Sequence, residues 1–428
     1  MQRRQRNIAF LLCAAAFVSA SAWAQTPKVA KLKPGNLDGE VVNAKGAPVA
    51  GAQILWQAAD GETPHVLHSD AQGRFRIEKL RAGPYELRAS AGGAWSEWEQ
   101  NVLVRPGADT SVTLRLKFKE PTVLPVELKG TIRTWDVPVP GSVPHDPAVD
   151  SKGNIWFTLQ ETGYLARFNP DMHEWKLFKV QTPDSGPHGL VADAAGDIWF
   201  TENYAGKIAR LDAKSGAIEE FTPPTAKDPH TPVFGPGGAL WFTAQNSNVI
   251  GRLELLTRKI TEYGVPTQDA HPYGIVSAGD GALWFCELTG GKLGRLDPTS
   301  GTLNEYAPPG DKIEPRRLVA LGGAIYFTDF GGGRLGRITI GDKKFKFWAS
   351  PSGGDSEPYG IAVDTTGKIW YEESASKANK LVRFDPAVEV FRTYPMPAPN
   401  SSVRNIARDA KGHLWMPLSL ANKIAVVE

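Results

Sequence analysis

One repeated segment of this chain of 428 residues contains a histidine and a glutamate that together could perform acid–base chemistry. In the segment GPHGLVADAAGDIWFTE, His188 lies fourteen residues before Glu202. An imidazole that titrates near neutral pH can take a proton from a substrate, and a carboxylate can bind a metal ion. Related segments follow along the chain, so the pair belongs either to a site or to a scaffold that is copied several times.

The period of these copies identifies the elements that must position the pair. One aromatic residue per copy recurs at steps of 42 to 45 residues. These residues are Trp156, Trp199, Trp241, Trp284, Tyr326, Trp370 and Trp415. A period near 40 residues, with four strand-length segments in each copy, is typical of the blades of a β-propeller. The sequence therefore predicts an all-β fold with a seven-bladed β-propeller over residues 131–428.

The copies are out of register with the ends of the chain. Residues 132–137 have the pattern of a fourth strand, whereas the last copy stops after its third strand, KIAVV. We expect residues 132–137 to pair with residues 424–427, because both strand edges would otherwise stay open.

Equivalent positions of the blades should meet around the axis of the ring, so a site there would draw residues from several copies. The candidate catalytic residues are His145, His188, His230 and Tyr359. The candidate ligand-binding residues are Asp228, Tyr273, Arg316 and Arg404. The candidate metal ligands are Glu202, Glu287, Glu357 and Glu373. The alternative for each glutamate is a structural one, in which it only caps the end of a strand.

The first 24 residues have the features of a secretory signal peptide: three arginines, a short apolar run and the small-x-small sequence Ala22-Trp23-Ala24. The run is too short to cross a membrane comfortably. Removing three of the 48 basic residues leaves 45 against 46 acidic residues, so the formal charge changes from +2 to about −1. We therefore expect an exported protein, periplasmic or secreted, with no membrane span after cleavage and no nucleic-acid partner.

A smaller domain is predicted between two linkers, at residues 25–34 and 119–130. Within residues 35–118, short alternating runs are separated by glycine-containing turns. The motifs Gly39-x-Val41, Gly46-Ala47-Pro48-Val49, Asp70-x-x-Gly73-x-Phe75 and Gly83-x-Tyr85 resemble a carboxypeptidase regulatory-like domain, a small transthyretin-like β-sandwich. The resemblance implies a binding or spacer module without catalysis, which could contact a protein partner in the cell envelope. Two prolines in EPTVLP predict that the two domains fold independently.

The large repeats resemble the virginiamycin B lyase, or streptogramin lyase, family over residues 132–427. The resemblance rests on the pattern P-H-G, D-x-x-G-x-I/L-W-F-T-E, G-K-I-G/A-R-L and I-x-E-F. It implies a metal-assisted elimination, normally with magnesium, that opens a cyclic depsipeptide at its ester bond without water. The family motif is a histidine on one blade, Glu-x-His on the next, and a glutamate fourteen residues later. No blade here carries the complete set: the second has Gly186 in place of the first glutamate, and the sixth has Tyr359 in place of the histidine.

Two functions are compatible with these residues. The first is a lyase-like enzyme that acts on a cyclic or ester-containing small molecule, with His188 or His230 as the base and with Glu357 and Glu373 holding Mg²⁺. The second is a non-catalytic propeller that binds a small ligand or a protein partner. A lactonase-type propeller would need a set of hard oxygen ligands for calcium at the axis, whereas this ring is rich in histidine.

Overall fold

The computed structural model describes residues 33–59, 65–92, 94–118, 122–124, 132–310, 312–375, 379–399 and 401–428. The predicted signal peptide lies outside these residues, as does all but the end of the predicted linker at 25–34. The described residues form β-strands and three short 3-10 helices: η1 (Gln160–Thr162), η2 (Pro236–Gly238) and η3 (Ser419–Ala421). In this part of the chain no helix has the length and hydropathy that crossing a bilayer requires.

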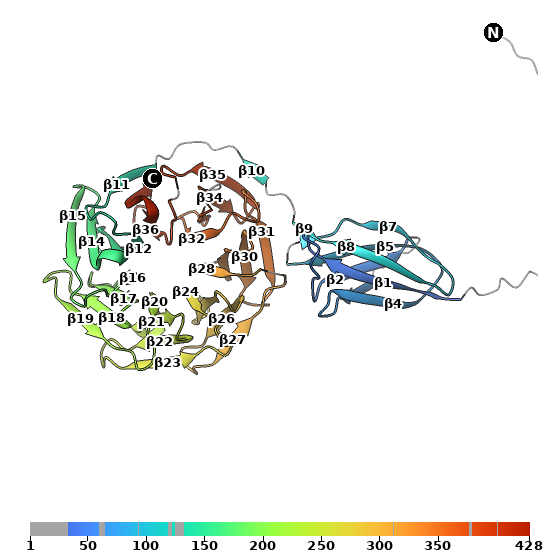
Figure 1. Cartoon of the computed structure of the whole chain (residues 1–428), viewed down its shortest axis with the longest axis horizontal. Coiled ribbons are helices and arrows are strands. Elements are labelled where there is room, and N and C mark those ends of the chain that lie inside the picture. Colours follow the sequence, from blue (N-terminus) through green and yellow to red (C-terminus); the bar gives the residue numbers. More distant parts are fainter. Residues whose placement is uncertain are drawn as a thin grey trace, which may run out of the picture.

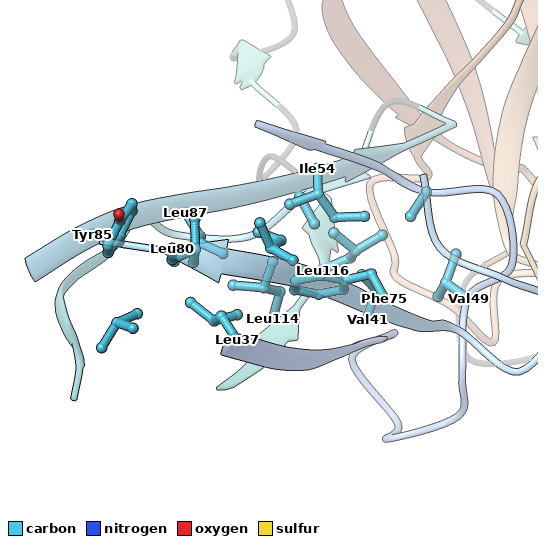
Figure 2. Packing of buried hydrophobic residues seen from close by; sticks show 14 of the residues in the cluster. Leu37, Val41, Val49, Ile54, Phe75, Leu80, Tyr85, Leu87, Leu114 and Leu116 are labelled. Atoms are coloured by element: carbon cyan, nitrogen blue, oxygen red, sulfur yellow. The ribbon is translucent and has the colours of Figure 1, made fainter. Parts of the chain in front are cut away.

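The smaller domain is a β-sandwich that lies beside the ring in Figure 1. One sheet has the order β4-β1-β8, and the other has the order β3-β2-β5-β6-β9, with β7 paired to β5. The strands are β1 (Gly35–Val42), β2 (Gln53–Ala58), β3 (His65–His68), β4 (Arg74–Leu80), β5 (Gly83–Ala91), β6 (Ala94–Trp95), β7 (Glu99–Val104), β8 (Asp109–Arg115) and β9 (Lys117–Phe118). Alternate residues such as Leu37, Ile54 and Leu87 point between the sheets and form the core shown in Figure 2.

Seven further sheets in the described residues are arranged in a ring (Figure 1). Five of them consist of four consecutive antiparallel strands. These are β12 (Pro144–Val149), β13 (Ile155–Leu159), β14 (Tyr164–Asn169) and β15 (Glu174–Lys179); β16 (Pro187–Ala192), β17 (Ile198–Glu202), β18 (Lys207–Leu211) and β19 (Ile218–Phe221); β20 (Pro229–Phe234), β21 (Leu240–Ala244), β22 (Val249–Leu253) and β23 (Ile260–Gly264); β24 (Pro272–Ser277), β25 (Leu283–Glu287), β26 (Lys292–Leu296) and β27 (Leu303–Tyr306); and β28 (Pro315–Leu321), β29 (Ala324–Asp329), β30 (Arg334–Thr339) and β31 (Phe345–Ala349).

The sixth and seventh sheets also contain strands from the beginning of the ring region. The sixth has the order β10-β35-β34-β33-β32, and the seventh has the order β11-β38-β37-β36. Their strands are β10 (Thr122–Leu124), β11 (Ile132–Asp136), β32 (Pro358–Val363), β33 (Ile369–Glu373), β34 (Lys380–Asp385), β35 (Val390–Pro395), β36 (Ala407–Arg408), β37 (Leu414–Leu418) and β38 (Lys423–Val427). The first strands β12, β16, β20, β24, β28, β32 and β36 lie nearest the centre (Figure 1).

Hydroxyl groups of the second strands tie neighbouring sheets together. The threonine two residues after the repeated aromatic donates a hydrogen bond to the carbonyl of the second residue of the next inner strand. The bonds run from Thr158 to His188 (2.5 Å), from Thr201 to His230 (2.8 Å), from Thr243 to Tyr273 (2.6 Å) and from Thr328 to Tyr359 (2.8 Å). The contacts are fully buried, so they fix how far each sheet is rotated against the next.

The predicted closure of the ring by the N-terminal strand is confirmed. Strand β11 pairs antiparallel with β38, from Ile132 opposite Val427 to Asp136 opposite Lys423. Trp135 stacks on Trp415 of the same sheet, with ring centroids 5.6 Å apart. The last sheet therefore joins both ends of the ring region.

The segment predicted as a linker at residues 119–130 also contributes a strand. Residues 122–124 form β10, which runs parallel to β35 with Thr122 opposite Val390 and Leu124 opposite Arg392. The Thr-Val-Leu sequence favours a strand, and the outer edge of the sixth sheet offers unpaired backbone groups to it. Part of the connection is thus bound to the ring.

Candidate functional site

Aromatic side chains from the second residues of the inner strands lie against one another around the axis, with neighbouring planes tilted by 44° to 51°. The imidazole centroids of His145 and His188 are 3.8 Å apart, and those of His188 and His230 are 3.9 Å apart. The ring of Tyr273 follows at 4.1 Å from His230, and its hydroxyl bonds that of Tyr359. The structure thus brings together five of the predicted site residues.

A sharp turn directs these side chains to the axis. The chain enters several inner strands through a residue with positive φ followed by a proline, for example Gly186 (φ 58°) before Pro187 and Glu357 (φ 52°) before Pro358. At Gly186 a Cβ would lie 2.4 Å from the ring of Tyr204, so a larger residue would force that exposed side chain to move.

Burial keeps the histidines of the ring neutral. His145, His188 and His230 are 1%, 4% and 2% exposed. Loss of water lowers the pKa of His145 to about 4 and lowers the pKa values of His188 and His230 well below the ordinary value, and nearby arginines add to the effect. At neutral pH each imidazole therefore has a free lone pair on one of its nitrogens.

The residue after each histidine determines how that imidazole is held. Nδ1 of His145 lies 2.9 Å from Oδ1 of Asp146. The pKa of Asp146 is lowered, with the Arg317 charge and the His145 hydrogen bond outweighing its burial, so this carboxylate can only accept. Nδ1 of His145 therefore carries the proton and Nε2 carries the lone pair. Nδ1 of His230 lies 2.8 Å from the hydroxyl of Thr231, whereas Nδ1 of His188 has no partner among the described residues.

A second polar layer lies next to the histidines, formed by the residues that follow them and their counterparts in the chain. Arg317 reaches across the axis and donates to Asp146 (2.9 Å) and to Thr231 (3.1 Å). Asn405 donates to the other oxygen of Asp146 (3.1 Å). These residues occupy positions at which other blades have Gly189, Gly274 and Gly360. Our sequence analysis missed this layer, and the departure from glycine is the signal that could have revealed it.

Two arginines, Arg316 and Arg404, complete the circle of axial side chains on its partly exposed side. The Arg316 guanidinium lies 3.5 Å from the ring centroid of Phe330 and 4.8 Å from that of Tyr359. The backbone carbonyl of Arg404 accepts a hydrogen bond from Arg317 (3.1 Å), which places Arg404 beside the polar layer. In the part of the chain that the structure describes, neither Arg316 nor Arg404 forms an ion pair, and the Nε atoms of both are buried without a hydrogen-bond partner.

Glu202 and Glu287 were predicted to face the axis, but their side chains point elsewhere. Each ends a second strand on the same face as a buried phenylalanine, so its side chain points between adjacent sheets. Both are fully buried. Burial raises the pKa of Glu202 to about 8 and that of Glu287 to about 7, and a nearby glutamate of the same sheet adds to each shift. These glutamates miss the axis because side chains alternate along a strand. The residue before each glutamate points toward one neighbouring sheet, and the glutamate points toward the other.

The other predicted carboxylates are also held locally. Glu373 accepts hydrogen bonds from the backbone N–H (3.0 Å) and the hydroxyl (2.5 Å) of Ser352. Asp228 accepts from the backbone N–H of Asn246 (2.6 Å) and from the hydroxyl of Ser247 (2.7 Å). Glu357 is exposed in the loop before β32. The structure therefore does not bring these residues into one site.

The described residues do not fit a magnesium ion held by the predicted glutamates. Among the described residues, one set of three possible metal ligands has its ligand atoms within 4.8 Å of one another. This set is His145, Asp146 and His188. Both oxygens of Asp146 are already engaged by Arg317 and Asn405, and the guanidinium would repel a cation. Magnesium also prefers several oxygen ligands to imidazoles.

Glu372 is a further buried carboxyl near the ring that our sequence analysis missed. It is fully buried at the position where other blades have Thr158, Thr201 or Thr243. Burial raises the pKa of Glu372 to about 8, although Ser374 donates a hydrogen bond to it. The charge of Arg404 acts on this carboxyl, so the two groups are close.

Two of the cavities in the described part of the chain adjoin the polar layer or the sandwich. One of about 420 Å³ is lined by the polar layer and by later residues of the inner strands, such as Val191, Val233 and Leu318. A second, of about 210 Å³, lies between the two domains, where Val49 and Leu116 of the sandwich face Pro309. Neither contains a residue of the histidine ring.

Two protein families match this chain, one in each part. The virginiamycin B lyase family matches residues 104–375, and the carboxypeptidase regulatory-like domain matches residues 36–117. No curated protein sequence is similar enough to count as a match.

Solved structures of related enzymes have the same fold as the ring of sheets. A streptogramin B lyase structure is 28% identical and aligns with 70% of this chain and 97% of its own, with a TM-score of 0.65. Selenomethionine-substituted virginiamycin B lyase from Staphylococcus aureus is also 28% identical, with a coverage of 70% and 99% and a TM-score of 0.64. A catalytically inactive variant of that enzyme with quinupristin is 26% identical, with the same coverage and a TM-score of 0.63.

Proposed function

Because this chain belongs to the virginiamycin B lyase family, we propose that its ring is a seven-bladed propeller that opens an ester or lactone bond of a small cyclic molecule by elimination. The observation that carries the proposal is the row of three adjacent neutral imidazoles at the axis. A general base must be unprotonated at the working pH, and these histidines meet that requirement.

His145 is the best-oriented base of the three. Its Nδ1–H donates to Asp146, so Nε2 is the atom that would take the proton from the carbon next to the substrate carbonyl. The electron pair of that C–H bond would form a double bond to the neighbouring carbon, and the C–O bond of the ester would break. The ester oxygen would leave as part of a carboxylate. Asp146 acts here as a positioning residue, in the way that a carboxylate orients the histidine of a catalytic triad.

The donor groups of the ring would orient the substrate. The hydroxyl of Tyr273 bonds that of Tyr359, and burial raises the pKa of Tyr273, so the Tyr273 hydroxyl stays protonated. We derive no step through a metal ion, because the predicted glutamates do not form a shared set of ligands.

A non-catalytic propeller that binds a small ligand is the second candidate. The extreme burial of the imidazoles favours it, because a base must come within hydrogen-bond reach of its substrate. The sandwich would then serve as a contact for a protein partner.

For either function we propose export to the periplasm or the medium, on the basis of the N-terminal pattern.

The mass of the product separates these functions. The full chain would be incubated with a set of cyclic depsipeptides and simple lactones, and the products would be analysed by mass spectrometry. Elimination gives a ring-opened product with the mass of the substrate and a new carbon–carbon double bond. A product heavier by one water would indicate a hydrolase, and unchanged substrates that bind in calorimetry would indicate the non-catalytic function.

The variant His145→Ala tests the assigned base. We expect turnover to fall by about 10²-fold or more, as is common when a general base is lost. His68→Ala in the exposed strand β3 is the matched control and should retain full turnover. Full activity of His145→Ala would contradict the role of His145.

A further inference from the structure

We propose that Arg316 and Arg404 form a carboxylate-binding pair at the partly exposed side of the ring, which holds the carboxylate released by elimination without a metal ion. The inference rests on the proposed function, and it defines the ligand as one that carries or generates a carboxylate.

The two guanidinium groups lack a counter-ion in the part of the chain that is described. Most arginines of the ring surface are paired, such as Arg210 with Asp197 and Arg295 with Asp280. Arg316 and Arg404 have no such partner, and their buried Nε–H groups are without an acceptor. An unpaired N–H donor away from water costs free energy, and a bound carboxylate would remove that cost.

Carboxyl groups on neighbouring segments are engaged elsewhere. Glu161 accepts from the hydroxyl of Tyr204 (3.2 Å), and Asp228 accepts from Ser247. Glu372 is the carboxyl on which the charge of Arg404 acts, but burial raises its pKa to about 8. Glu372 is therefore uncharged at neutral pH and does not neutralise Arg404.

The surroundings of Arg316 hold it in place for binding. Its guanidinium packs on Phe330 at 3.5 Å and lies within 6 Å of the rings of Tyr359 and Tyr273, at 4.8 Å and 5.8 Å. These aromatic rings surround the guanidinium and supply no carboxylate to its N–H donors. A carboxylate binds to such donors in a bidentate manner.

The chemistry of elimination requires such a group. When the C–O bond breaks, the ester oxygen takes the bonding electron pair, and negative charge spreads over the two oxygens of the new carboxylate. A cation placed there stabilises the developing charge. In this chain the neutral imidazoles would take the proton. Beside them, Arg316 and Arg404 are the cations without a counter-ion, because Arg317 is neutralised by Asp146.

Binding of paired probes tests the proposal without turnover. The full chain would be titrated by calorimetry with benzoate and with benzamide, which has the same shape without the charge, in buffer with and without EDTA. We expect benzoate to bind and benzamide to bind at least tenfold more weakly, with no effect of EDTA. Equal binding of the two probes, or benzoate binding that EDTA abolishes, would overturn the proposal.

Arginine variants identify the binding residues. Arg316→Gln and Arg404→Gln should each weaken benzoate binding at least tenfold. Arg258→Gln, in an exposed turn between β22 and β23, is the matched control and should bind like the parent chain. Melting temperatures without ligand show that each variant is folded, and Arg404→Lys provides a milder change that keeps the charge. Unchanged binding in both glutamine variants would refute the pair.

The outcomes distinguish this inference from the proposed function. Benzoate binding that depends on the arginines, in a chain that turns over no ester, retains the carboxylate pair and rejects the lyase. Ester elimination that both glutamine variants perform at the parent rate retains the lyase and rejects the pair.

Discussion

At the scale of single residues, burial rather than residue type determines what the titratable groups can do. His145 loses its charge because it leaves water, and Glu202 gains a proton for the same reason. Both are typical residues of acid–base sites, but only the histidine faces the axis. The glutamate lies between two sheets, where its protonation affects stability rather than chemistry.

The raised pKa of Glu202 makes stability depend on pH. The folded chain keeps the proton up to a pKa of about 8, whereas an unfolded glutamate loses it near 4.5. The free energy of unfolding should therefore fall as the pH rises through this window, because the folded chain holds a proton that the unfolded chain releases. Glu202→Gln should flatten the pH profile of the melting temperature between these values. An unchanged profile in the variant would contradict this assignment.

The buried ion pair of Asp146 and Arg317 should couple two opposite parts of the ring. Asp146→Ala leaves a buried guanidinium without its partner and should cost about 3–5 kcal/mol. Replacing both residues, as in Asp146→Leu with Arg317→Met, should cost less than the two single changes together, as urea unfolding of the four proteins would show. Additive single costs would mean that the pair contributes no coupling.

At the scale of elements, the position of one strand decides whether the ring is closed. Strand β11 lies far from β38 in sequence but completes the same sheet, and Trp135 carries much of that contact. The indole packs against Trp415 and, at 5.1 Å, against Phe168 of the first sheet of the ring. The side chain thus joins the last sheet to the first.

Trp135→Ala should weaken this junction. Loss of an aromatic side chain from a packed contact costs about 3 kcal/mol, which would appear as a lower midpoint of urea unfolding. Trp98→Ala in the sandwich is a matched control, because that indole is 39% exposed. A midpoint for the Trp135 variant that equals the control would show that the junction does not limit stability.

At the scale of the whole molecule, the connection between the domains belongs in part to the ring. Strand β10 covers the outer edge of the sixth sheet, so the sandwich is attached through a segment that is itself paired. Unpaired strand edges promote association between chains, and β10 removes part of one such edge.

Two fragments test this role. A chain that begins at residue 122 and one that begins at residue 126 should both fold, because the ring has its own core. The longer fragment should melt about 2–4 °C higher and should aggregate less, as differential scanning calorimetry and light scattering would show. Identical behaviour of the two fragments would mean that β10 adds nothing to the ring, and an insoluble pair would show that the ring needs the sandwich.

The sequence by itself determined the features that depend on local pattern. The recurrence from Trp156 to Trp415 indicated repeated sheets, and the pattern of residues 132–137 indicated the closing strand. The histidines of the inner strands could be placed at the axis because each begins an equivalent strand of its copy. These features follow from spacing along the chain, which the sequence displays directly.

Only the tertiary structure decided which side chains meet. Glu202 could not be distinguished from an axial ligand, because its direction depends on strand alternation within the packed ring. Arg317 and Asp146 are separated by 171 positions in the chain, and only closure of the ring places them 2.9 Å apart. The same closure leaves Arg316 and Arg404 without a carboxylate partner. Contacts across an axis depend on all sheets at once, and no local pattern records them.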